Sequence, residues 1–171
     1  MKLVILLLLP LGCFAQITLD KKITLGNKVE LLVPGLLKEM TEDNWVIKYH
    51  QAKRPAVVLT DENAEVNLMI DTTMQPAGED NLEEYKNFRK ENLRKTRTDV
   101  EFLQDSVVTV NGKKMAYIKF MSQAIDTKIF NYYFFTVANG RIVFFGFNCM
   151  EKLKDEWEKI ADAMMASVKT Y

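Results

Sequence analysis

The 171-residue sequence contains little of what most catalytic and metal sites require: one histidine, His50, and two cysteines, Cys13 and Cys149. A Ser-His-Asp triad, a Cys–His pair or a histidine-based zinc site would each depend on His50, and the sequence has no Gly-x-Ser-x-Gly motif to partner it. The glycine-rich motifs that cradle phosphates are also missing. We therefore predict no catalytic residue, no metal site and no cofactor, and we expect that the protein is not an enzyme.

The chain has no excess of charge, since 23 Lys and Arg balance 23 Asp and Glu. Nucleic-acid binding needs a basic excess that displaces counterions from phosphates, so we expect no nucleic-acid partner. After the first few residues, no uncharged apolar run reaches the length of about 20 residues that spans a bilayer. The hydrophobic content of 48% is typical of a folded domain with an ordinary core.

The first fifteen residues have the three-part pattern of a secretory signal peptide. Lys2 supplies the positive start, an apolar run follows over 3–9, and Ala15 is the small residue before Gln16. We predict a signal peptide over 1–15, cleavage between Ala15 and Gln16, and one domain over 16–171, without a transmembrane segment after processing. In the alternative, Leu-Gly-Cys ending at Cys13 is a lipobox and the protein is lipid-anchored through Cys13.

Processing leaves Cys149 as the last cysteine, so an exported chain would have no internal disulfide. Cys149 follows an apolar stretch, and we expect it to be a small buried hydrophobe. The acidic stretch 61–65 resembles a calcium loop but lacks the central glycine and distal glutamate, so we expect a polar hairpin tip there. Gly146 lies in an aromatic strand, which indicates close packing or a bulge.

Short strands are expected first in the chain. A strand pair should cover 22–33, with its turn at Gly26-Asn27, and further strands should cover 45–49, 56–60 and 66–70. Apolar residues at helical spacing then predict an amphipathic helix over 81–97 and a second over about 151–169. Acids crowd the start of the first helix and bases its end, in the order that the helix dipole favours. We interpret these bases as dipole-matched surface charge.

Two hairpins should follow the first helix, because Asn111-Gly112 and Asn139-Gly140 are strong turn signals. They join strands over 102–110 and 113–121, and over 128–138 and 141–149. The second pair is apolar on both faces, whereas a solvent-facing sheet alternates with polar residues. We therefore predict an α+β fold, in which helices cover both faces of an antiparallel meander as an α-β-α sandwich.

This order of elements resembles the PsbP-like fold family, which includes the bacterial DcrB-like envelope proteins and the Ran-binding Mog protein. The motifs that carry the resemblance are fold motifs: Leu31-Leu32-Val33-Pro34, Val110-Asn111-Gly112-Lys113, Val137-Ala138-Asn139-Gly140-Arg141 and Ser167-Val168. The resemblance implies the α-β-α sandwich and an accessory or binding role. It carries over no functional residue.

We therefore expect an exported protein of the bacterial envelope, periplasmic or secreted, that acts as a non-enzymatic binding or assembly-accessory module. Its partner would be an unidentified protein, and we expect the chain itself to be a monomer. In the alternative, it carries a small apolar ligand or lipid in a groove beside the sheet, because aromatic and Met residues are abundant. A hydrolase with an unrecognised site is a third hypothesis.

Overall fold

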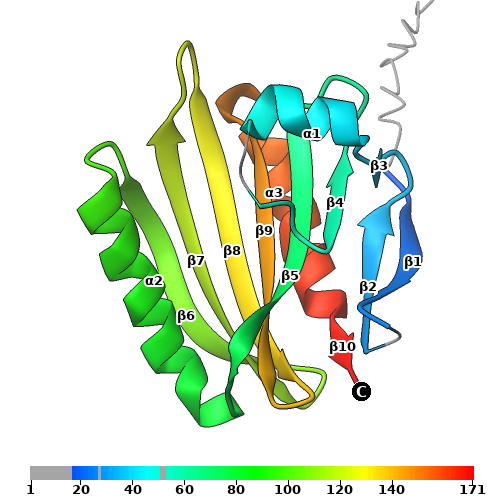
Figure 1. Cartoon of the computed structure of the whole chain (residues 1–171), viewed down its shortest axis with the longest axis vertical. Helices are drawn as coiled ribbons and strands as arrows, with labels where there is room; N and C mark the ends of the chain where they lie inside the picture. Colours follow the sequence, from blue (N-terminus) through cyan, green and yellow to red (C-terminus); the bar gives the residue numbers. More distant parts are fainter. Residues whose placement is uncertain (1–16, 27, 51–52) are drawn as a thin grey trace, which may run out of the picture.

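Two antiparallel sheets and three helices make up the fold of this computed structural model, which describes residues 17–26, 28–50 and 53–171 (Figure 1). The signal-peptide prediction for 1–15, its cleavage site at Ala15 and Gln16, and Cys13 lie outside the described residues. The larger sheet has the strand order β3-β4-β5-β9-β8-β7-β6 and the smaller one the order β1-β2-β10.

The strands are β1 (Leu19–Thr24), β2 (Val29–Pro34), β3 (Lys38–Glu39), β4 (Val57–Thr60), β5 (Val66–Pro76), β6 (Glu101–Val110), β7 (Lys113–Gln123), β8 (Lys128–Ala138), β9 (Arg141–Met150) and β10 (Lys169–Thr170). The helices are α1 (Glu42–Tyr49), α2 (Leu82–Thr96) and α3 (Lys154–Ser167), and short 3-10 turns precede α2 (Glu79–Asn81) and α3 (Glu151–Leu153).

The two predicted Asn-Gly hairpins are confirmed and form the meander β6-β7-β8-β9. Asn111 and Gly112 have φ values of 50° and 78°, and Asn139 and Gly140 have values of 50° and 68°. Positive φ at both central residues is what a two-residue turn between twisted strands requires. These turns set the register that sends alternate aromatic residues to opposite faces.

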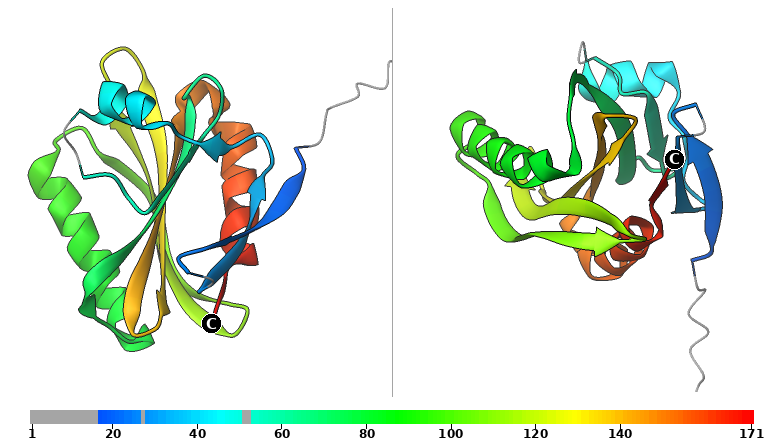
Figure 2. Two further views of the ribbon diagram at one scale, coloured as in Figure 1. Left: turned by 45° about the vertical axis from the view of Figure 1, so that its right-hand side comes forward. Right: turned by 90° about the horizontal axis from the view of Figure 1, so that it is seen from below.

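The sheet is apolar on both faces, as predicted, and α2 and α3 lie on opposite sides of it (Figure 2). On one face, Phe130, Tyr132 and Phe134 belong to the core cluster that also contains Trp157 and Met164 of α3. On the other face, a second cluster joins sheet residues to the first turn of α2. Its buried members are Leu82, Ala116, Ile118, Phe120, Phe135 and Ile142.

The smaller sheet completes the cover of the α3 face, and its buried residues Val29 and Leu31 join the α3-side cluster. The last helix, predicted over about 151–169, is confirmed as the 3-10 turn over 151–153 and α3, which ends at Ser167. Ser167 Oγ donates to Met164 O in the last turn of the helix, and it accepts from Leu32 N at 2.8 Å. The same hydroxyl therefore caps the end of α3 and links it to β2. The chain then extends through β10 and pairs with β2.

The predicted strand over 45–49 is also wrong, because this segment is the helix α1. Thr41 caps it by accepting from Asn44 N at 3.3 Å, and two acids follow in the first turn. Trp45 and Tyr49, one helical turn apart, stack with ring centroids 4.3 Å apart. Trp45 is buried with Met40 and Val58, and this contact holds α1 across the end of the larger sheet.

Two buried lysines fasten helices to the sheet. Lys86 of α2 lies 2.9 Å from Asp105 of β6, and 6% of its side chain is exposed. Lys119 of β7 lies on the opposite face and pairs with Glu158 and Asp162 of α3. Each lysine stays charged because carboxylates form ion pairs with its ammonium group, which is largely shielded from water.

Candidate functional site

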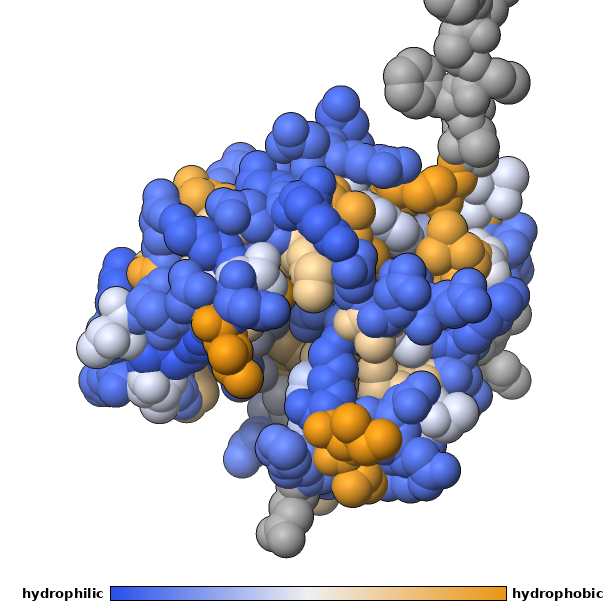
Figure 3. All heavy atoms as spheres, turned by 90° about the horizontal axis from the view of Figure 1, so that it is seen from above, coloured by the Kyte–Doolittle hydropathy of each residue, from blue (hydrophilic) through white to orange (hydrophobic). Residues whose placement is uncertain are grey.

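A recess with a volume of about 500 Å³ opens at the end of the larger sheet that carries α1. Its floor is made by β5, β9 and β8, one wall by α1, and the other by the β7–β8 turn and Arg97. We call it the α1-end recess. Figure 3 looks down on this end of the molecule and shows a hollow beside an apolar patch over α1.

A row of three asparagines crosses the floor, because Asn67 of β5 pairs with Asn148 of β9, which pairs with Asn131 of β8. Residues directly opposite on neighbouring strands share one face, so the three amides lie side by side. Asn67 Nδ2 donates to Asn148 Oδ1 at 3.0 Å. Thr60 Oγ1 and Lys48 Nζ both donate to Asn67 Oδ1, at 3.0 and 3.2 Å.

The other end of the amide row is fixed less completely. Asn131 Nδ2 donates to Ser122 Oγ at 2.9 Å and to Ile129 O at 3.1 Å. Within the described part of the chain, no donor reaches Asn131 Oδ1, so this oxygen is open to the recess. Burial raises the pKa of Tyr49 to about 12, and the neighbouring Asn148 side chain opposes that effect.

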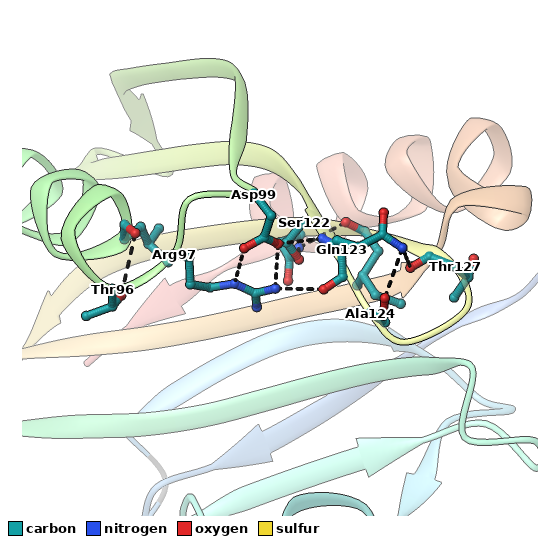
Figure 4. Close-up of polar contacts among 10 residues, drawn as sticks. Thr96, Arg97, Asp99, Ser122, Gln123, Ala124 and Thr127 are labelled. Carbon is teal, nitrogen blue, oxygen red and sulfur yellow. Dashed lines mark hydrogen bonds and ion pairs between the residues drawn. The ribbon is translucent and has the colours of Figure 1, made fainter.

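Arg97 follows α2 and braces the β7–β8 turn (Figure 4). Its Nε and Nη2 donate to the two oxygens of Asp99, and Nη2 also donates to Gln123 O at 2.8 Å. Asp99 in turn accepts from Gln123 N at 2.6 Å. The Arg97 guanidinium and the Gln123 amide hold the pKa of Asp99 down at about 2, so the carboxylate stays charged and the brace stays rigid.

Lys48 forms part of the opposite wall, and its side chain remains accessible to solvent there. Its Nζ donates to neutral oxygens, namely Ala64 O and Asn67 Oδ1. Burial lowers the pKa of Lys48, and the Asp61 carboxylate opposes that effect. The wall therefore carries a positive charge that no carboxylate of the described residues pairs within 4.0 Å.

Tyr133 closes the floor towards α2. Its ring packs edge-on against Phe120 and Phe144, with centroids 5.0 Å away in both cases. The Arg89 guanidinium of α2 lies 5.8 Å from the Tyr133 ring and 5.4 Å from the Phe144 ring. Burial raises the pKa of Tyr133, while Arg89 and Arg97 pull it the other way. Its phenol is therefore a hydrogen-bond donor at neutral pH.

Exposed apolar side chains flank the recess on both sides. Val46 and Ile47 project from α1 with 51% and 74% of their surfaces exposed, and Ile125 at the tip of the β7–β8 turn is fully exposed. Single exposed apolar side chains are common on protein surfaces, but a group of them beside a recess is typical of a binding surface.

The residues singled out in the sequence lie elsewhere or have structural roles. His50 is exposed at the end of α1, and Glu62 and Asn63 lie in the β4–β5 turn. Cys149 is a fully buried free thiol, and a side chain at Gly146 would meet the Phe144 ring at 2.8 Å, which confirms close packing. Across residues 17–171, gaps at 27 and 51–52 apart, no three His, Cys, Asp or Glu residues gather as a metal site.

Sequence reasoning missed the α1-end recess. Two of its amides come from the β8–β9 hairpin, but the third comes from β5, which is far away in the sequence. The helix α1, which forms one wall, is a strand in the sequence-based prediction. One feature of the sequence could have indicated the recess. Each of the two aromatic strands contains one asparagine, Asn131 or Asn148, and the two positions are paired across the hairpin. A polar residue at an otherwise apolar strand position often marks a hydrogen-bonded network.

No family model matches the sequence, and no curated protein matches it. Solved structures do match. The solution structure of cyanobacterial PsbP (CyanoP) from Synechocystis sp. PCC 6803 matches with a TM-score of 0.65 and 14% identity, and the match covers 94% of this chain and 96% of that one. LpqN of Mycobacterium tuberculosis, a protein involved in cell envelope biogenesis, matches with a TM-score of 0.59 and 10% identity over 90% of this chain and 91% of that one. A protein from Bacteroides thetaiotaomicron VPI-5482 matches with a TM-score of 0.59 and 15% identity over 88% of this chain and 48% of that one.

At sequence identities of 10–15%, these comparisons establish a similarity of fold. The order of elements, the Asn-Gly meander and the helices on both faces are those that the sequence motifs indicated. The chain therefore has the PsbP-like fold, an α+β sandwich that it shares with CyanoP and LpqN.

Proposed function

We propose that the chain is an exported, non-enzymatic binding protein of the bacterial cell envelope that holds a partner protein at the α1-end recess. The observation that carries the proposal is the amide row of Asn67, Asn148 and Asn131 on the floor of a recess with exposed apolar flanks. Protein interfaces combine apolar contact area with a small number of fixed hydrogen bonds in this way.

The chemistry of the recess favours recognition over catalysis. Amides neither gain nor lose protons near neutral pH, and the raised pKa values of Tyr49 and Tyr133 keep both phenols protonated. Such groups donate and accept hydrogen bonds but are poor bases. Their positions are set by neighbouring bonds, so little entropy is lost when a partner binds.

Export is supported by the signal-peptide pattern of residues 1–15 and by the likeness to LpqN, which is involved in envelope biogenesis. None of the helices in the described part of the chain is long and apolar enough to span a membrane. N-terminal sequencing of the protein from cell envelopes should give Gln16 as the first residue. An unprocessed chain in the cytoplasm would overturn export, and palmitate labelling that Cys13→Ala abolishes would establish the lipid-anchored alternative.

Partner binding is tested by site-specific photo-crosslinking in intact cells. A photo-reactive amino acid that replaces Ile47 or Ile125 should give the same discrete protein adduct. Lys113, exposed as the first residue of β7 and thus at the opposite end of that strand, provides the matched control position. Adducts of equal yield from the control position, or none from the two test positions, would overturn the proposed binding surface.

A second candidate function, transport of a small apolar ligand, is favoured by one observation. A pocket of about 380 Å³ lies between α2 and the end of β5, lined in part by Tyr85, Phe88 and Ile142. Phe88 has 59% of its surface exposed there. A fluorescent fatty acid should then bind with an affinity that Phe88→Ser weakens and Ile125→Ser does not. Absence of binding to the unmodified protein would exclude the carrier function.

A further inference from the structure

We infer that the α1-end recess recognises a carboxylate of its partner, held between Arg97 and Lys48 above the floor formed by Tyr133 and the amide row. The inference rests on the proposed function and names the group that the partner presents. The carboxylate could belong to an acidic side chain or to a chain terminus, and the experiment below distinguishes these sources.

Arg97 is positioned to bind an anion and has donors to spare. Asp99 and the Gln123 carbonyl engage its Nε and Nη2. Figure 4 shows the remaining guanidinium nitrogen turned away from both partners. A guanidinium that is fixed by one carboxylate presents its free N–H groups in a defined direction, which is the arrangement that favours a second carboxylate.

Lys48 supplies charge from the opposite wall. Its ammonium donates to a backbone carbonyl and to the Asn67 amide, and the Asp61 carboxylate acts on it without coming within ion-pair distance in the described part of the chain. An ammonium on the wall of a recess attracts an anion that enters the recess, and the low-dielectric surroundings of the floor reduce the screening between the two charges.

The floor adds a phenol beside a second unpaired cation. Arg89 lies over the Tyr133 ring and forms no ion pair with any residue that the structure describes, and its buried Nε has no hydrogen-bond partner among those residues. Arg89 and Arg97 both act on the Tyr133 hydroxyl. The positive potential at the floor therefore comes from α2 as well as from the walls.

The acids around the recess do not cancel this potential. Glu65 is paired with Lys152 at 2.7 Å, and Asp99 is engaged by Arg97. Asp126 is exposed at the tip of the β7–β8 turn, where water screens it. Met69 and Met150 supply apolar lining, which suits the hydrocarbon that accompanies a carboxylate and offers nothing to a free phosphate.

The inference is tested with probes that differ in one group. N-acetyl-leucine and its amide report on a terminal carboxylate, N-acetylglutamate amide and N-acetylglutamine amide report on an acidic side chain, and inorganic phosphate reports on a simple anion. Each is titrated into the full-length protein while the side-chain amide resonances of Asn131 and Asn148 are followed by NMR. We expect one carboxylate probe to bind at least about tenfold more tightly than its amide, as a charged hydrogen bond provides.

The variants separate the recess from general charge. Lys48→Met and Arg97→Gln should each weaken the carboxylate probe about tenfold, whereas Lys159→Met, an exposed site on α3, should not change it. Because Arg97→Gln also loosens the β7–β8 turn, Lys48→Met is the deciding variant. It leaves Thr60 as a donor to Asn67.

The inference fails if neither carboxylate probe binds better than its amide, if phosphate binds equally well, or if Lys48→Met leaves binding unchanged. Cross-links from Ile47 and Ile125 together with such a failure would mean that a partner protein binds without a carboxylate. Carboxylate binding without any cross-link would support the recess chemistry and overturn the proposed protein partner.

Discussion

Lys119 of β7 lies 2.9 Å from Asp162 of α3, beneath the helix, with only 7% of its side chain exposed. Glu158 of the same helix lies 3.0 Å from the ammonium. Burial alone would lower the pKa of Lys119, but the hydrogen bonds to Asp162 and Glu158 outweigh it and raise the pKa. The lysine therefore stays charged and fastens α3 to the sheet.

The two sides of this ion pair should respond differently to mutation. Asp162→Asn combined with Glu158→Gln leaves a buried unpaired charge and should lower the free energy of unfolding by about 3 kcal/mol. Lys119→Met should cost much less, since the acids it releases are partly exposed and methionine can pack on the Tyr132 ring that the ammonium now covers at 4.6 Å. Urea denaturation measures both. Lys152→Met, which removes an exposed pair, is the control, and equal losses from the two sides would contradict the prediction.

Gly146→Ala should destabilise the protein by about 1–3 kcal/mol. The added methyl group would meet Phe144 Cε1 at 2.8 Å, and that ring is held by Tyr133 and Arg89. Gly78→Ala is a matched control, since its nearest neighbour would be 3.9 Å away. Thermal unfolding decides the matter. A loss no larger than that of the control would mean that the ring moves freely.

Acid should weaken the brace between α2 and the β7–β8 turn. The pKa of Asp99 is about 2 in the folded protein, below its usual value of 3.8, so the stability it contributes is complete above the usual value and is lost as the pH falls towards 2. Asp99→Asn should therefore be less stable than the unmodified protein at pH 7, and the difference should shrink between pH 5 and pH 2. A difference that stays constant over this range would show that Asp99 acts through packing alone.

Cys149 should be inert in the folded protein. Burial raises the pKa of its thiol to about 12, and Lys154 only partly offsets that effect. In a Cys13→Ala background, Ellman's reagent at pH 8 should detect no thiol until urea is added, because the thiolate is the reactive form. Lys159→Cys in the same background, exposed on α3, should react at once. Rapid labelling of Cys149 without denaturant would show that β9 opens locally.

The parts of the fold that rest on local signals could be predicted from the sequence. Asn111-Gly112 and Asn139-Gly140 require positive φ, and so they located the hairpins and the meander. The aromatic residues on both faces of β8 required covers, and α2 and α3 have the amphipathic spacing to supply them.

What sequence reasoning missed depends on contacts between distant residues. The segment 45–49 is rich in residues that favour strands. It is nevertheless helical, because Thr41 caps α1 and Trp45 packs against Met40 and Val58. A two-residue strand such as β10 carries no pattern of its own. The recess likewise depends on register, since only pairing places Asn67 and Asn131 on either side of Asn148.

The pairing of β10 with β2 bears on the order in which the protein can fold. The last residues of the chain supply the third strand of a sheet whose first two strands are among the earliest made, with Lys169 opposite Glu30 and Thr170 opposite Val29. Ser167 adds a hydrogen bond to Leu32 from the same late segment. The β1–β2 hairpin therefore lacks this neighbouring strand until residues 169–170 have been made. The smaller sheet is therefore complete only after β10 has been made, so its stability depends on a contact between strands that lie far apart in the sequence.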